Sequence, residues 1–106
     1  MSLEELDDDH LLALYIVHKE GEKGALRINL VRKLGKVVGE EVTIQIIEHL
    51  KGKYMIEIGT SLKMDGNRPR WTPVYKILKN YRETLSMIPS NKPDVYKRFL
   101  RVPDNV

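Results

Sequence analysis

Three histidines and four serines are the side chains best suited to act as metal ligands, bases or nucleophiles. His10, His18 and His49 are 8 and 31 residues apart, and neither interval is a metal-binding spacing. The serines lie in no nucleophile motif. The chain has no cysteine, which excludes thiolate chemistry and disulfides. The sequence therefore predicts a protein that is not an enzyme and that binds no metal and no cofactor.

Three consecutive aspartates, Asp7 to Asp9, precede the apolar run Leu11–Val17. Side chains at successive positions of a helix point in different directions and do not converge on one ion. Aspartate is instead favoured as an N-cap, where it complements the positive end of the helix dipole. We therefore interpret this cluster as the start of a helix.

Three cations surround an Asp65-Gly66 pair, a dipeptide typical of two-residue hairpin turns. A turn centred there pairs Lys63 with Arg68 and Ser61 with Arg70, and gathers all three cations on one face. Like charges directly opposite each other destabilise a hairpin. A bound polyanion would neutralise them. The alternative is a solvated edge that deters strand aggregation.

Charge is divided unevenly along the chain, whose net charge is +3. The first 20 residues hold six acids and one base, for a charge of −5, and the remainder holds seventeen bases and nine acids, for +8. A basic body suits a polyanionic partner, although a solvated surface with an acidic helix start accounts for the same numbers.

Apolar spacing predicts two consecutive helices before the hairpin. Leu30, Val31 and Leu34 recur at helical intervals, with Gly35 as a stop signal. A second helix, from Glu40 to Lys51, has its apolar positions at Val42, Ile46, Ile47 and Leu50 and ends at Gly52. Alternation from Ile56 to Met64 then predicts a strand.

Helix, tight link, helix and hairpin follow in the order of a winged helix-turn-helix domain, which this chain resembles over about residues 10 to 85. Three segments carry the resemblance: Leu30-Val31-Arg32-Lys33-Leu34-Gly35, Ile46-Ile47-Glu48-His49-Leu50 and Met55-Ile56-Glu57-Ile58. The chain is similar to small PadR- and MarR-type regulators. It is also similar to small winged-helix proteins of archaea, their viruses and plasmids, including site-specific DNA-binding adaptors of plasmid segregation.

The resemblance implies sequence-specific binding of double-stranded DNA by a cytoplasmic homodimer, as a transcriptional regulator or as a DNA segregation adaptor. The second helix would be the recognition helix, with outward positions Glu41, Thr43, Ile44, Gln45, Glu48 and His49. Contacts to the DNA backbone would come from Arg27, Arg32, Lys33 and Lys36. The wing would add Lys63, Arg68 and Arg70.

Two other functions remain open. Acids on the recognition helix also suit a winged-helix module that binds protein and does not read DNA. If the chain does bind DNA, another protein of the DNA-bound complex would be a further partner. The basic wing and tail also suit RNA. No apolar run reaches the length needed to span a membrane, so no membrane partner is expected.

Periodicity after the wing predicts a helix from Pro73 to Ile88, with Thr72 as its N-cap. Its apolar stripe exceeds what a small core can cover, so we expect it to form a dimer interface with the first helix. The expected interface residues are Leu12, Ile16, Val74, Ile77, Leu78, Tyr81, Leu85 and Ile88.

The expected fold is therefore α+β and mostly helical, a winged helix-turn-helix of three helices plus a β-hairpin wing, with a C-terminal dimerisation helix. A flexible leader would cover residues 1–6, the domain 7–72 and the dimerisation helix 73–88. The remainder, 89–106, would be a basic tail with a short helix that begins at Pro93.

Overall fold

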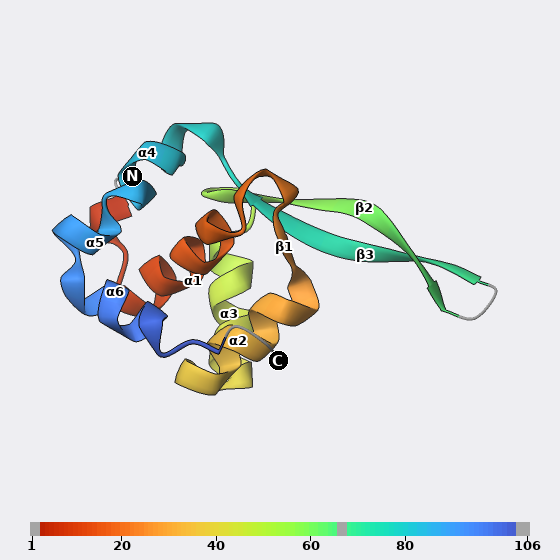
Figure 1. The fold of residues 1–106 in the computed structure, drawn as a ribbon, viewed down its shortest axis with the longest axis horizontal. Helices are drawn as coiled ribbons and strands as arrows, with labels where there is room; N and C mark the ends of the chain where they lie inside the picture. Colours follow the sequence, from red (N-terminus) through yellow and green to blue (C-terminus); the bar gives the residue numbers. More distant parts are fainter. Residues whose placement is uncertain (1–2, 66–67, 104–106) are drawn as a thin grey trace.

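The computed structural model describes residues 3–65 and 68–103. It is mostly helical with one small antiparallel sheet, so the expected α+β, mostly helical class is confirmed (Figure 1). In chain order, the elements are η1 (Leu3–Glu5), α1 (Asp8–Lys19), η2 (Gly21–Lys23), β1 (Ala25–Leu26), α2 (Arg27–Val38), α3 (Glu40–Leu50), β2 (Met55–Asp65), β3 (Arg68–Ile77), η3 (Lys79–Tyr81), α4 (Arg82–Ser86), α5 (Ile88–Asn91) and α6 (Pro93–Leu100).

Helix α1 begins as predicted, because the Asp7 side chain accepts a hydrogen bond from the backbone N–H of His10 at 2.9 Å. This bond is the main reason that the pKa of Asp7 lies below its ordinary value. The predicted loose leader is wrong at Leu3, which is buried in the core. Leu3 belongs to the one-turn helix η1 and to the same core cluster as the buried residues of α1.

The all-round burial of α1 is explained within one chain. Every residue from Leu11 to Val17 is buried, and α1 packs against α2, α3, β3, α4 and α6. The C-terminal helix supplies much of this cover. The Tyr15 and Phe99 rings meet edge to face at 4.7 Å, and Arg98 pairs with Asp9 at 2.6 Å. The C-terminal helices therefore lie where the sequence suggested a partner subunit.

The predicted helix over residues 73–88 is wrong, because residues 68–77 form strand β3. This strand lies between β1 and β2, and Tyr75 pairs with both Ala25 and Glu57. Tyr75 lay off the apolar stripe of the helical interpretation, yet it is fully buried. Pro73 lies opposite Gly59 at a bulge, a position where a strand tolerates proline.

The hairpin register also differs from the prediction. Lys63 pairs with Arg70 and Asp65 with Arg68, where we expected Lys63 opposite Arg68. The observed register moves Lys63 from Arg68 to Arg70 and adds an Asp–Arg pair at the end of the ladder. It leaves residues 66 and 67, which lie outside the described residues, between the two strands. The Lys63–Arg70 pair remains a like-charge pair.

His18, near the end of α1, is expected to make the stability of the fold depend on pH in the acidic range. Burial lowers the pKa of His18 below its ordinary value, and Lys19 and Arg82 lower it further. The folded state then binds fewer protons at His18 than the unfolded state does. This contribution to stability is therefore lost as pH falls below about 6.5. We expect His18→Gln to weaken the decline in unfolding free energy between pH 7 and pH 5, measured by urea titration. Identical pH profiles for the two proteins would contradict this.

Candidate nucleic-acid interface

Helices α2 and α3 are joined by one residue, Gly39, whose φ of 94° ends α2 and turns the chain. The predicted stop at Gly35 is wrong: α2 continues through it to Val38, and the Gly39 N–H bonds back to the Gly35 carbonyl at 3.0 Å. A side chain at Gly39 would meet open space, so its conformation and not close packing requires glycine there.

Helix α3 presents five of its six predicted contact positions to solvent. Glu41, Ile44, Gln45, Glu48 and His49 are exposed. Thr43 is a correction, because it is fully buried.

The Thr43 hydroxyl donates to the Gly39 carbonyl at 2.7 Å. Val42, which we expected in the core, is 41% exposed instead. The buried Thr43 hydroxyl, which bonds to a backbone carbonyl one turn earlier, fills the core position, and Val42 joins Ile44 as an exposed apolar residue of α3.

His49 is held by α1. The His10 Nε2 and His49 Nδ1 atoms lie 3.3 Å apart, so one of these nitrogens donates to the other. On its other side, His10 Nδ1 lies 2.6 Å from Asp7 Oδ1. No local pattern in the sequence indicates this chain of contacts, because positions 10 and 49 are brought together only by the packing of α1 on α3. Part of the predicted reading surface is therefore committed to holding two helices together.

Two of the four predicted backbone contacts are engaged inside the protein. Arg27 donates to the Tyr75 hydroxyl at 2.6 Å, and Lys33 pairs with Glu20 at 3.2 Å. Arg32 and Lys36 are exposed, and neither has an ion-pair partner among the described residues. They are one helical turn apart on α2.

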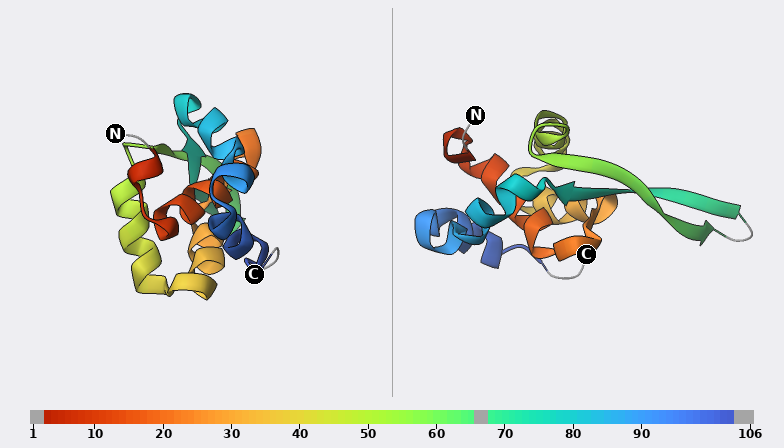
Figure 2. Two further views of the ribbon diagram at one scale, coloured as in Figure 1. Left: turned by 90° about the vertical axis from the view of Figure 1, so that its left-hand side faces the viewer. Right: turned by 90° about the horizontal axis from the view of Figure 1, so that it is seen from above.

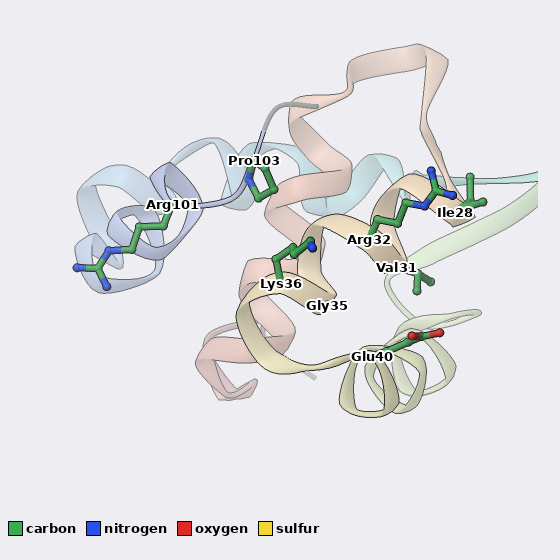
Figure 3. Close-up of a pocket in the computed structure, with 8 residues that line it drawn as sticks. All are labelled: Ile28, Val31, Arg32, Gly35, Lys36, Glu40, Arg101 and Pro103. Atoms are coloured by element: carbon green, nitrogen blue, oxygen red, sulfur yellow. The ribbon is translucent and has the colours of Figure 1, made fainter. Parts of the chain in front are cut away.

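A groove of about 1010 Å³ runs along this face of α2 (Figure 3). Its floor is apolar: Ile28, which is 48% exposed, Val31 and the backbone at Gly35. Its rim carries the cations of α2, with the start of α3 and the segment after α6 on either side. The rim residues are Arg32, Lys36, Glu40, Arg101 and Pro103. Arg101 belongs to the predicted basic tail, and only the tertiary structure brings it to the groove.

Strands β2 and β3 form a long hairpin that projects beyond the helices (Figure 1), and the protein measures 47 × 27 × 21 Å. Seen from above, the far half of the hairpin has no helix on either side (Figure 2). All three predicted wing cations lie in this part of the ladder, with Lys63 opposite Arg70 and Arg68 opposite Asp65.

The predicted dimer interface is occupied within the protomer. Leu12 and Ile16 of α1 are buried, and the remaining predicted positions are buried or half-buried within the single chain. The half-buried positions are Leu78 and Tyr81, and the buried ones are Val74, Ile77, Leu85 and Ile88. The expectation of an uncovered apolar stripe was wrong. Its residues lie partly on strand β3 and partly on the short helices that follow, and both β3 and α4 pack against α1.

Within residues 3–65 and 68–103, no three histidine, aspartate or glutamate side chains are grouped as metal ligands. Nor does any helix of that part combine the length and apolarity needed to cross a bilayer. No family model, no curated protein and no solved structure matches this chain.

Proposed function

We propose that this protein is a winged helix-turn-helix protein that binds double-stranded DNA, with the β2–β3 hairpin as its main electrostatic contact. The order of elements supports this domain type. Helix α1, the short strand β1, the α2–α3 pair and the β2–β3 hairpin follow one another, and β1 joins the hairpin in one sheet. Transcriptional regulation and the marking of a DNA site would both require this activity.

The pairing of Lys63 with Arg70 is the observation that carries the proposal. Directly opposed cations destabilise a strand pair by a few tenths of a kcal/mol to about 1 kcal/mol. Beyond the bulge at residues 59–61, the two strands carry Lys63, Arg68 and Arg70 against the single acid Asp65. A projecting ribbon with this excess of positive charge fits a groove or a phosphate backbone, where counterion release drives binding.

The position of helix α3 in the chain fits the proposed domain type, but its exposed side chains are poorly suited to reading base pairs. It contains no lysine or arginine, and Glu41 and Glu48 are both exposed. Carboxylates near phosphates are repelled unless they accept from a cytosine amino group. Gln45 is the one exposed amide on the helix. The proposal therefore gives the hairpin, and not α3, the larger share of the binding energy.

Fluorescence anisotropy with labelled duplex DNA, duplex RNA and single-stranded DNA tests the proposal. We expect duplex DNA to bind best, with an affinity that falls steeply between ~50 and ~200 mM salt because phosphate contacts dominate. Tighter binding of duplex RNA would support the RNA-binding alternative. Absence of binding to all three at low salt would overturn the proposal.

A further inference from the structure

The outer face of α3 forms an acidic ridge, made of Glu41, Ile44, Gln45 and Glu48. These positions follow i, i+3, i+4 and i+7 spacing, so they line up along one side of the helix. Ile44 is 37% exposed in the middle of the ridge. Among the described residues, Glu48 pairs with Lys51 at 3.4 Å, and Glu41 has no cationic partner. A row of acids around an isoleucine is poorly suited to a phosphate backbone.

The α2 groove is also poorly suited to a single phosphate. Ile28 and Val31 give it an apolar floor, which a phosphate cannot use. A volume of about 1010 Å³ is instead large enough for several side chains. Cations around an apolar floor suit an acidic segment that has an apolar centre.

We propose that the acidic ridge of one copy docks in the α2 groove of a second copy, and that the second copy returns the same contact. Glu41 and Glu48 would meet Arg32 and Lys36, and Ile44 would cover the apolar floor. The proposal concerns self-association and does not depend on DNA binding.

The placement of the two surfaces in one chain favours a symmetric pair. Glu40 both lines the groove and begins α3, so the ridge starts where the groove ends. A two-fold axis at this junction brings each ridge to the other groove, as in an isologous dimer. The lengths agree: residues 41–48 and 28–36 each span about 10–12 Å of helix.

Charge exchange between the two surfaces provides the test. One variant carries Glu41→Lys with Glu48→Lys, and the other carries Arg32→Glu with Lys36→Glu. All four side chains are exposed, so both variants should keep the circular dichroism spectrum of the native chain. Sedimentation velocity should show a dimer for the native chain. Each variant alone should associate at least ~100-fold more weakly, because like charges then face each other.

Sedimentation of an equimolar mixture of the two variants is the decisive experiment for the proposed dimer. In a mixed pair, both contacts again join opposite charges, so the mixture should sediment as a dimer. The proposal is overturned if the native chain stays monomeric at high micromolar concentration, if either variant alone dimerises normally, or if the mixture stays monomeric. It is also overturned if Arg32→Glu with Lys36→Glu lowers duplex affinity without changing the sedimentation of the protein, since the groove would then be a phosphate contact.

Discussion

Replacing Arg68 and Arg70 together with alanine is expected to flatten the plot of log affinity against log salt by about two units per subunit. Each lost phosphate contact releases one counterion fewer, and the slope counts these counterions. The two positions lie on β3 in the projecting part of the hairpin, opposite Asp65 and Lys63. Anisotropy titrations of a duplex at several salt concentrations measure the slope directly.

A matched control separates local contact from the loss of net charge. Lys79→Ala with Lys97→Ala removes two positive charges as well, from exposed positions on η3 and α6. Lys79 follows the end of β3 that is remote from Arg68, and α6 lies among the helices, away from the hairpin (Figure 1). We expect the control to keep the native slope and the native unfolding temperature. If both double variants change the slope equally, the hairpin makes no phosphate contacts of its own. In that case, DNA binding through this element is the wrong function.

Gly24→Ala is expected to destabilise the protein by more than about 3 kcal/mol. Gly24 has a φ of 78°, and an added Cβ would lie 2.6 Å from Val74 Cγ1 and 2.7 Å from the Tyr75 carbonyl oxygen. The carbonyl belongs to the central strand β3, so relief of the clash requires β1 and the turn before it to move away. Chemical denaturation measures the loss, and weaker DNA binding should accompany it because this sheet carries the hairpin.

Gly21→Ala is the matched control for Gly24→Ala. Gly21 also has a positive φ, of 73°, but an added Cβ there meets no atom within 4 Å. Only the backbone cost of a side chain in the left-handed region remains, about 1–2 kcal/mol. The difference between the two variants therefore measures the close approach of residue 24 to β3, together with the backbone cost of a side chain at the ψ of 178° that Gly24 adopts. Equal losses would show that the contact with β3 contributes nothing.

Local patterns in the sequence determined several features of this protein. The aspartate N-cap of α1, the outward positions Glu41, Gln45 and Glu48 of α3, and the short helix that begins at Pro93 were predicted and are present. Each depends on interactions between residues within a few positions of one another. A cap bonds to the next turn, and helical spacing determines which side chains share a face.

Only the tertiary structure decided the features that depend on distant partners. The apolar positions from Val74 to Leu78 fit a helix and a strand equally well, and pairing of Tyr75 with Ala25 and Glu57 selected the strand. Packing of α6 on α1 then covered the surface that we assigned to a dimer. Arg27 and Lys33 contact Tyr75 and Glu20, which are distant in the sequence, whereas Arg32 and Lys36 of the same helix stay exposed. Sequence spacing determines which side chains share a face of one helix or strand. Burial and charge pairing depend on which other element packs against that face.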